Sequence, residues 1–336
     1  MLNKVDICGI GGSIVDQQYK VSHDLIEKAG LKLNEMRLAS PEEHKKLIQL
    51  LAANNYIPMS ACGGSATNTI VATSYFGSNA HQLCSIANDT DGKLFLDSLT
   101  DAGVTYTNTD HQNISLPTAK CIVLVTPDGK RTMSTCLGIS SCFDSEKINL
   151  DCISNTNYVY IEGYMVTDNN DIILTILKKA RDLNKNIVLS LSDPWVASTY
   201  KNNLLQWCSS PVELLFCNDA EALAFTDSIT LDEAKEKLKS YASKFVITCG
   251  ANGAIIYDGK SFITINAPLV NVIDTNGAGD IFAGAFLHRL IRHNTFKQAG
   301  EFAAEVAAKL VQHFGARLNK EDYIKLESKT APIIIK

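Results

Sequence analysis

The chain has 336 residues, of which 46% are hydrophobic and 20% are charged. This length and composition fit about two globular domains, or one large α/β domain with an insertion, and exclude a disordered, collagen-like or coiled-coil chain. With 31 Lys and Arg against 36 Asp and Glu, the formal charge is -5. We therefore expect no nucleic-acid partner and no attraction to an anionic membrane surface.

Apolar runs, cysteines and histidines give further expectations. No run approaches the roughly 20 apolar residues of a membrane span, and Asp6 interrupts the apolar run nearest the N-terminus. The 10 cysteines contain no C-x-x-C pair, and the 7 histidines contain no H-E-x-x-H. We expect a cytoplasmic protein with reduced, buried cysteines, no membrane contact and no transition metal of its own.

Short β-rich runs alternate with helical patterns along most of the chain. Helices with apolar residues at three-to-four spacing are predicted for residues 171–184, 231–243 and 297–314. Strands are predicted for residues 5–10, 158–161, 186–191, 214–217 and 245–248. This alternation predicts a Rossmann-like, three-layer α/β/α domain around a mostly parallel sheet.

Two segments break the alternation. Residues 16–39 follow the first strand directly, and residues 116–138 predict a β-hairpin that turns through PDGK at 127–130. We expect these segments to form a small β-rich lid beside the large domain. The expected boundaries give the lid residues 16–39 and 111–139, and the large domain residues 1–15, 40–110 and 140–336.

The sequence GIGGSIVD at residues 9–16 looks at first like a dinucleotide-binding fingerprint. Ile14 occupies the position of the third glycine and no helix clearly follows, so we reject a nicotinamide-dinucleotide site. Asp16 stands at the exit of a sheet strand, where open α/β sheets bind ligands. It is either a surface turn residue or an acceptor for two sugar hydroxyls.

The sequence GGSATN at residues 63–68 precedes a helical run at 69–76. The paired glycines, Gly63 and Gly64, would let a substrate approach the backbone, and Asn68 lies one helical turn further on.

The sequence NDAE at residues 218–221 directly follows an apolar strand. Asn218 and Glu221 are three residues apart at a helix start, which is the spacing of a capping box. The same pair offers oxygen atoms to Mg²⁺ and to the waters that this ion retains. Both interpretations stay open on the sequence.

The strongest local signal is DTNGAGD at residues 274–280, followed by a strongly apolar helix. Gly277, Ala278 and Gly279 leave successive backbone N–H groups unobstructed at the positive end of the helix dipole, an arrangement that binds anions. Asp280 would repel such an anion, so a general base for an attacking hydroxyl is the better role. The alternative is that Asp280 only complements the helix dipole and the glycines only turn the chain.

These motifs, together with TCGANG at 248–253, resemble the PfkB (ribokinase-like) carbohydrate kinase family almost from end to end of the chain. The resemblance implies a sugar or nucleoside kinase with a Rossmann-like domain and a small β lid. It implies ATP and Mg²⁺ as cofactors, and a monovalent cation is a further candidate. The expected partner is a small-molecule nucleoside or sugar, and the chain is either a monomer or a homodimer.

The resemblance also assigns a role to each matching position. Asp280 would deprotonate the acceptor hydroxyl, and the amides of Gly277, Ala278 and Gly279 would bind the γ-phosphoryl group. Contacts to the substrate would come from Asp16, Gly63, Gly64, Asn68, Met165 and Arg131. Contacts to MgATP would come from Asn218, Glu221, Thr248, Gly250, Gly253 and Asn276, with Glu221 near Mg²⁺ through water. Arg131 lies on the predicted hairpin, and its alternative role is a solvated charge at a strand end.

Within the family the chain is most similar to the adenosine kinases, through IEGYMVT at 161–167, LSLSDPW at 189–195 and DTNG at 274–277. Gly12 stands where the family commonly has Asn, and Met165 stands where an aromatic ring would stack on the base. The expected reaction is ATP-dependent phosphorylation of a primary hydroxyl of a ribosyl compound, adenosine to AMP. The alternatives are a kinase of a free sugar such as ribose or fructose, and a catalytically silent regulator that binds a nucleotide or sugar.

Overall fold

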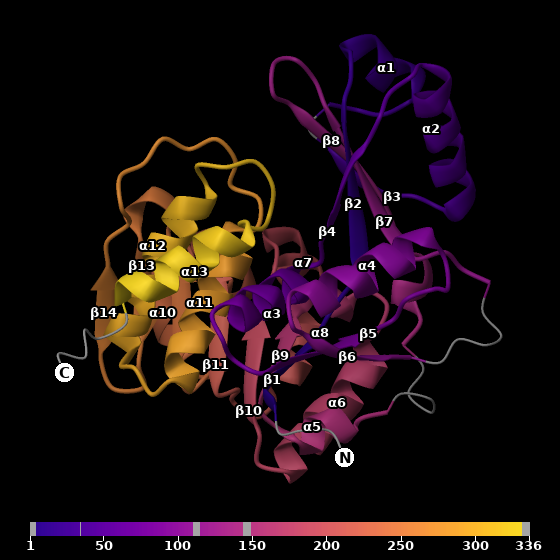
Figure 1. Cartoon of the computed structure of the whole chain (residues 1–336). Coiled ribbons are helices and arrows are strands. Elements are labelled where there is room, and N and C mark those ends of the chain that lie inside the picture. The colour runs from indigo at the N-terminus through magenta and orange to yellow at the C-terminus, as the bar shows by residue number, and fades with distance from the viewer. Residues whose placement is uncertain (1–4, 34, 110–114, 144–148, 331–336) are drawn as a thin grey trace.

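A large sheet of nine strands lies between two layers of helices (Figure 1). The computed structural model describes residues 5–33, 35–109, 115–143 and 149–330. The strand order is β14-β13-β12-β11-β10-β9-β1-β5-β6, and every neighbouring pair is parallel except the two pairs that β13 makes. The strands are β1 (Val5–Ile10), β5 (Ala80–Cys84), β6 (Thr105–Asn108), β9 (Thr156–Glu162), β10 (Asn186–Ser190), β11 (Leu214–Asn218), β12 (Phe245–Thr248), β13 (Ala254–Tyr257) and β14 (Phe262–Ile265).

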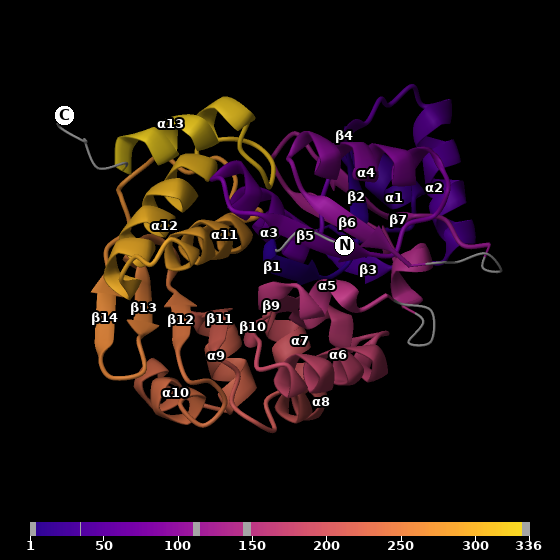
Figure 2. The ribbon, with the colours of Figure 1, turned by 60° about the horizontal axis from the view of Figure 1, so that its bottom comes forward.

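Helices cover both faces of this sheet, as Figure 2 shows from a second direction. One layer contains α3 (Ser65–Tyr75), α4 (Thr90–Asp101), α11 (Ala278–Ile291), α12 (Phe296–Leu310) and α13 (Lys320–Thr330). The other contains α5 (Asp151–Ser154), α6 (Asn170–Asp182), α7 (Pro194–Thr199), α8 (Lys201–Trp207), α9 (Asp219–Thr226) and α10 (Leu231–Leu238). Short 3₁₀ turns are η1 (Gly138–Ser141), η2 (Gly163–Val166) and η3 (Gly250–Asn252).

The sheet has an apolar core on each face because its central strands are apolar on both sides. In β10, Val188 belongs to the core under α3, α11 and α12, whereas Ile187 and Leu189 belong to the core on the opposite face. Continuous apolar strands of this kind are expected where a parallel sheet is covered on both faces. The predicted three-layer α/β/α architecture is confirmed.

A second, small sheet of five strands projects from the large one (Figure 1), in the order β3-β8-β7-β2-β4. Its elements are β2 (Ile14–Lys20), β3 (Met36–Leu38), β4 (Met59–Cys62), β7 (Ala119–Val125) and β8 (Arg131–Cys136), with helices α1 (His23–Lys28) and α2 (Pro41–Ala53). The predicted hairpin is present as β7 and β8, which pair antiparallel, and Gly129 in its turn has a φ of 78°.

The small sheet takes more of the chain than the sequence suggested. Residues 40–62 were assigned to the large domain, but β4 pairs antiparallel with β2. Leu47 and Leu51 of α2 belong to the same buried cluster as Ile122 and Leu124 of β7. The reason is that the apolar stripe of α2 packs on one face of the small sheet. The segment from β2 to β4 therefore belongs to the small sheet and its helices.

Candidate active site

The candidate site lies where the chain crosses between the two sheets. These crossings, at residues 11–13 and 63–64, follow the end of β1 and the end of β4. β1 and β9 are neighbours, and later strands are added outward on both sides of this pair. Such a reversal of strand order is a topological switch point, and open α/β sheets bind ligands beside it at the carboxyl ends of the strands.

Asp280 lies in the first turn of α11 and contacts two side chains of α3. Its Oδ1 accepts a hydrogen bond from Ser65 Oγ at 2.7 Å, and its Oδ2 accepts one from Asn68 Nδ2 at 2.9 Å. Burial raises the pKa of the Asp280 carboxyl above its ordinary value, while these two hydrogen bonds and the charge of Arg317 act in the opposite direction. The site thus holds a fixed carboxylate that accepts a proton more readily than an exposed one.

The glycine turn, residues 277–279, opens α11 without a side-chain cap. Gly277 has a φ of 73°, and a Cβ at this position would lie 2.6 Å from Ala316 O, so only glycine fits. A Cβ on Gly279 would meet nothing within 4 Å, so the approach to this residue is open. Ala278 N donates a hydrogen bond to Thr275 O within the turn, with an N···O distance of 3.2 Å. First-turn N–H groups have no acceptor inside their own helix, and they attract an anion.

Asp16 and the paired glycines face the same region from the small sheet. Burial raises the pKa of Asp16 to about 6; the charge of Arg317 lowers this pKa, and that of Asp280 raises it. A Cβ on Gly63 would lie 2.5 Å from Asp16 Oδ2, and one on Gly64, whose φ is 91°, would lie 2.1 Å from Gly12 O. Any side chain at these two positions would displace Asp16 or the crossing at residues 11–13.

Two charged residues of the site were missed by the sequence analysis. Glu162 at the end of β9 is 2% exposed and accepts hydrogen bonds from Gly12 N at 2.8 Å and Ala66 N at 2.6 Å. Burial raises the pKa of Glu162 to about 7, although both hydrogen bonds lower it. Arg317 donates from Nε to Asn68 Oδ1 at 2.8 Å. Glu162 stands inside IEGYMVT at 161–167, which carries the resemblance but assigns this residue no role, and Arg317 stands in none of the quoted motifs. Both lie far in sequence from the groups that they contact.

The sequence assignment of Met165 to the substrate pocket is corrected by the structure. Met165 is 2% exposed and belongs to the buried core that includes Leu191 and Val196. The reason is that η2 turns this side chain down toward the core. The adjacent Tyr164 is 38% exposed, and burial together with the charges of Asp193 and Asp280 raises the pKa of its hydroxyl. Tyr164 is therefore the accessible aromatic side chain of this segment.

Arg131 is partly exposed, and it pairs with the loop that leads into the glycine turn. Its Nη1 lies 2.9 Å from Asp274 Oδ1, and its Nη2 lies 2.9 Å from Asp274 Oδ2. The same carboxylate accepts hydrogen bonds from Asn276 N and Gly315 N, both at 2.9 Å. Asp274 thus joins the β7–β8 hairpin to the start of α11. The Arg131 hydrogen bonds help to hold the pKa of the buried Asp274 below its ordinary value, against the effect of its burial.

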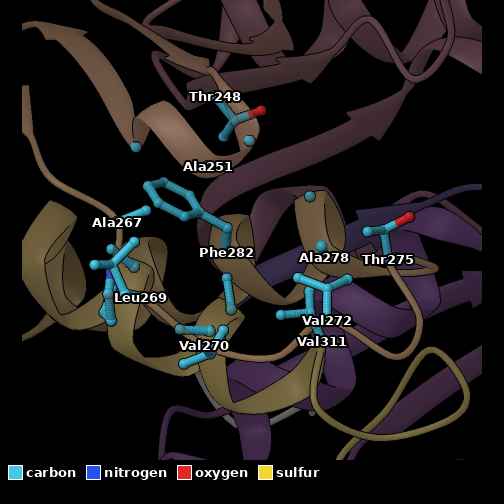
Figure 3. Close-up of a pocket in the computed structure, with 17 residues that line it drawn as sticks. Thr248, Ala251, Ala267, Leu269, Val270, Val272, Thr275, Ala278, Phe282 and Val311 are labelled. Carbon is cyan, nitrogen blue, oxygen red and sulfur yellow. The ribbon is translucent and has the colours of Figure 1, made fainter.

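An apolar cavity of about 270 Å³ lies on the other side of the glycine turn (Figure 3). Of the predicted nucleotide contacts, Thr248, Gly250 and Gly253 line it. The ring of Phe282 lies between Thr248 and Leu269, and Thr275 lies beside Ala278 at the opposite end. Its lining also includes Ala304, Ala307, Ala308 and Val311 of the α12 region. Asn276 does not line this cavity, and the adjacent Thr275 does.

Asn218 and Glu221 form a reciprocal capping box at the start of α9. Asn218 Oδ1 accepts from Glu221 N at 2.8 Å, and Glu221 Oε2 accepts from Asn218 N at 3.1 Å. Asn218 Nδ2 also donates to Glu221 Oε1 at 2.6 Å. The pKa of Glu221 is raised to about 7, mainly by burial and also by the charges of Asp193, Asp280 and Asp219, against the lowering effect of the hydrogen bond from Asn218 N. The structure therefore contains the capping box that the spacing predicts.

In the part of the chain that the structure describes, no three or more His, Cys, Asp or Glu side chains are grouped to hold a metal ion. Within the same residues, none of the helices has the length and apolar character needed to cross a membrane.

Known proteins resemble this chain in sequence and in fold. The profile of the pfkB family carbohydrate kinases matches residues 58–322. Adenosine kinase 1 of Arabidopsis thaliana is 27% identical over 332 residues, which cover 89% of this chain and 93% of that protein. The structure of a probable sugar kinase protein from Rhizobium etli has a TM-score of 0.84 at 26% identity, covering 97% of this chain and 99% of the other. The structure of adenosine kinase from Sinorhizobium meliloti has a TM-score of 0.83 at 25% identity, covering 97% and 98%.

Proposed function

Because the chain belongs to the pfkB family of carbohydrate kinases, we propose that it transfers the γ-phosphoryl group of ATP to a primary hydroxyl of a ribosyl acceptor, adenosine, giving AMP. The observation that carries the proposal is the placement of Asp280. This carboxylate lies beside an uncapped glycine turn and is held by Ser65 and Asn68. Adenosine is the preferred acceptor because relatives that match most of the chain are named adenosine kinases.

In the proposed reaction Asp280 accepts the proton of the acceptor hydroxyl as that oxygen attacks the γ-phosphorus of ATP. The new O–P bond forms while the bond between the γ-phosphorus and the β-γ bridging oxygen breaks, so the products are ADP and the phosphorylated acceptor. The N–H groups of the glycine turn would bind the oxygens of the transferred group. A pKa raised by burial makes Asp280 a stronger base than an exposed aspartate.

The acceptor would lie between Asp280 and the small sheet. Asp16 would accept hydrogen bonds from two hydroxyls of the sugar, and Asn68 would contact the same ring. Gly63 and Gly64 support this role because any side chain there would displace Asp16 or the crossing beneath it. In place of Met165, Tyr164 offers an accessible ring against which a base would pack.

ATP would bind on the opposite side of the glycine turn. Its adenine ring would fill the apolar cavity lined by Gly250, Gly253 and Phe282, with Thr248 at the edge. Asn276 would lie beside the phosphates, because its own N–H already bonds to Asp274 next to the glycine turn.

The residues around Glu221 fit Mg²⁺ bound through water. The charges of Asp193, Asp219 and Asp280 all act on the Glu221 carboxyl, so this region is acidic and offers oxygen atoms, which Mg²⁺ prefers. When bound, Mg²⁺ would neutralise charge on the phosphates. Because Asn218 already occupies both Glu221 oxygens, Glu221 would act on the waters of the ion.

Substituting Glu221→Gln tests this metal role. The amide keeps a hydrogen-bonding cap but removes the charge that Mg²⁺ and its waters would feel, so the Mg²⁺ concentration for half-maximal activity should rise several-fold. A Mg²⁺ titration of the kinase rate measures it. Asp232→Asn is the matched control, because this exposed carboxylate of α10 pairs with Lys235 and is not among the charges that act on Glu221. An unchanged Mg²⁺ dependence and kcat would leave capping as the sufficient account of Glu221.

We propose that the small sheet acts as a lid over the acceptor. It carries Asp16 and Arg131, and the pair of Arg131 with Asp274 connects the lid to the α11 loop. A lid excludes water, so that ATP reacts with the acceptor and is not hydrolysed.

A side-by-side comparison of acceptors tests the choice of adenosine. We expect kcat/KM for adenosine to exceed that for ribose or fructose at least about tenfold, the factor that corresponds to some 1.4 kcal/mol of contact with the base. Phosphoryl transfer from MgATP, measured with each acceptor at the same enzyme concentration, gives the ratio. Equal or faster turnover of a free sugar would reject adenosine and support the sugar-kinase alternative. No turnover of any acceptor would support a silent regulator.

A further inference from the structure

Arg317 lies in the segment between α12 and α13, and Asn68 lies between it and the proposed catalytic Asp280. Its Nε donates to Asn68 Oδ1 at 2.8 Å, and its Nη1 lies 3.0 Å from Ser98 Oγ. Its Nη2 is buried and has no hydrogen-bond partner among the residues that the structure describes. Both hydrogen bonds go to neutral side chains, so the charge of the guanidinium acts on the nearby carboxylates of Asp16 and Asp280 without a direct hydrogen bond to either.

These contacts fix the orientation of the Asn68 amide. The amide has an acceptor at Oδ1 and donors at Nδ2, and it can turn by 180°. With the Arg317 Nε–H directed at Oδ1, the Nδ2 group is directed at Asp280 Oδ2. The opposite orientation would place two donors face to face at Arg317 and two acceptors face to face at Asp280.

We propose that Arg317 is a positioning residue for phosphoryl transfer: through Asn68, it holds the Asp280 carboxylate in the orientation that accepts the proton of the acceptor hydroxyl. This inference rests on the proposed role of Asp280 as the base. Arg317 touches neither the acceptor nor ATP in this scheme, and it acts through the α3 side chain that it orients.

The charge of Arg317 gives the proposal a pH signature. This charge lowers the pKa of Asp280 and of Asp16, so its removal should raise both. The other groups whose charges interact with Asp280 are Asp16, Tyr160, Glu162, Tyr164 and Glu221. Those facing Arg317 itself are Cys62, Tyr75, Tyr323 and Asp16. Since a base works only when deprotonated, activity is lost as the pH falls through the pKa of Asp280, and this acid limb should move to higher pH without Arg317.

The test compares Arg317→Met, Arg317→Lys and the wild-type chain by kcat as a function of pH, with thermal unfolding as the measure of folding. We expect Arg317→Met to lower kcat at least about tenfold, as for the loss of a hydrogen bond to a charged group, and to move the acid limb to higher pH. Arg317→Lys keeps the charge, so its acid limb should stay near that of the wild type, with kcat between the two.

Arg289→Met is the matched control. This arginine of α11 packs over the Phe302 ring at 3.9 Å and pairs with Glu327, about 13 Å along the helix from Asp280. Its loss should lower the stability but leave the acid limb in place. A folded Arg317→Met chain with kcat within about twofold of the wild type and an unmoved acid limb would overturn the proposal. An equal shift in Arg289→Met would also overturn it.

If Arg317→Met does not fold, Arg317→Lys and Ser98→Ala decide the question. Ser98→Ala removes the other hydrogen bond of Arg317 and leaves Asn68 and Asp280 intact, so a several-fold loss of kcat is expected in both variants. Wild-type kcat in both would reject the proposal. Asp280→Asn separates this inference from the proposed function. An active Asp280→Asn enzyme overturns both, whereas an inactive one beside an unaffected Arg317→Met enzyme overturns only the role of Arg317.

Discussion

Replacing Asp280 with Asn should lower kcat by about 10²–10⁴ while the chain stays folded. Asn has nearly the shape of Asp and still faces Ser65 and Asn68, but it cannot accept the proton of the acceptor hydroxyl. The negative charge beside the glycine turn also disappears, so ATP binding should not weaken. Measurements of kcat, KM for both substrates and the thermal unfolding midpoint together separate lost chemistry from lost folding.

Ser65→Ala is the companion variant for this experiment. It removes one of the two hydrogen bonds to Asp280 and keeps the carboxylate, so its effect on kcat should be much smaller than that of Asp280→Asn. Near wild-type turnover by folded Asp280→Asn would show that another group acts as the base or that none is needed. The glycine turn would then remain as an anion site without the proposed partner.

Much of the fold could be predicted from the sequence because periodicity is a local property. The strands β1 and β12 have the predicted bounds, and the helix predicted to begin at residue 231 begins there. That helix ends at Leu238, earlier than expected, and α2 and β4 belong to the small sheet. Strand pairing decides such assignments, and pairing depends on contacts between residues far apart in the sequence.

The candidate site likewise contains residues that the sequence identifies and residues that only long-range contacts reveal. Asp280 and the glycine turn lie in one continuous motif, so the sequence was enough to single them out. No role for Glu162 or Arg317 follows from the local sequence, because their importance comes from Ala66 and Asn68, which they contact from 96 and 249 positions away.

Met165 lies in a segment whose motif does not determine which individual side chain faces the site. The resemblance through residues 161–167 places Met165 against the substrate, but the 3₁₀ turn η2 directs neighbouring side chains differently. Tyr164 is therefore accessible and Met165 is buried. Spacing in a sequence does not fix which of two adjacent side chains faces a cavity when the local turn is irregular.

The pair of Arg131 with Asp274 should control closure of the small sheet. Asp274 is 5% exposed and accepts hydrogen bonds from the Arg131 side chain of β8, from Asn276 N before α11 and from Gly315 N after α12. Removing one member of a buried, hydrogen-bonded charge pair costs about 2 kcal/mol or more, because the other charge stays buried without a counter-ion. We therefore expect Arg131→Met to favour the open lid and to lower kcat/KM for the acceptor about thirtyfold or more.

Hydrogen exchange and kinetics together test this closure. In the wild-type chain, exchange in β7 and β8 should slow when the acceptor is added, because the lid closes over it. In Arg131→Met the exchange should be faster and should respond less to the acceptor. Lys130→Met is the matched control, since this neighbouring cation pairs with Asp128 at the exposed hairpin tip and should change neither quantity. If Arg131→Met kept the exchange and the kcat/KM of the wild type, the contact with Asp274 would have no role in closure. The crossings at residues 11–13 and 63–64 would then have to hold the small sheet over the acceptor.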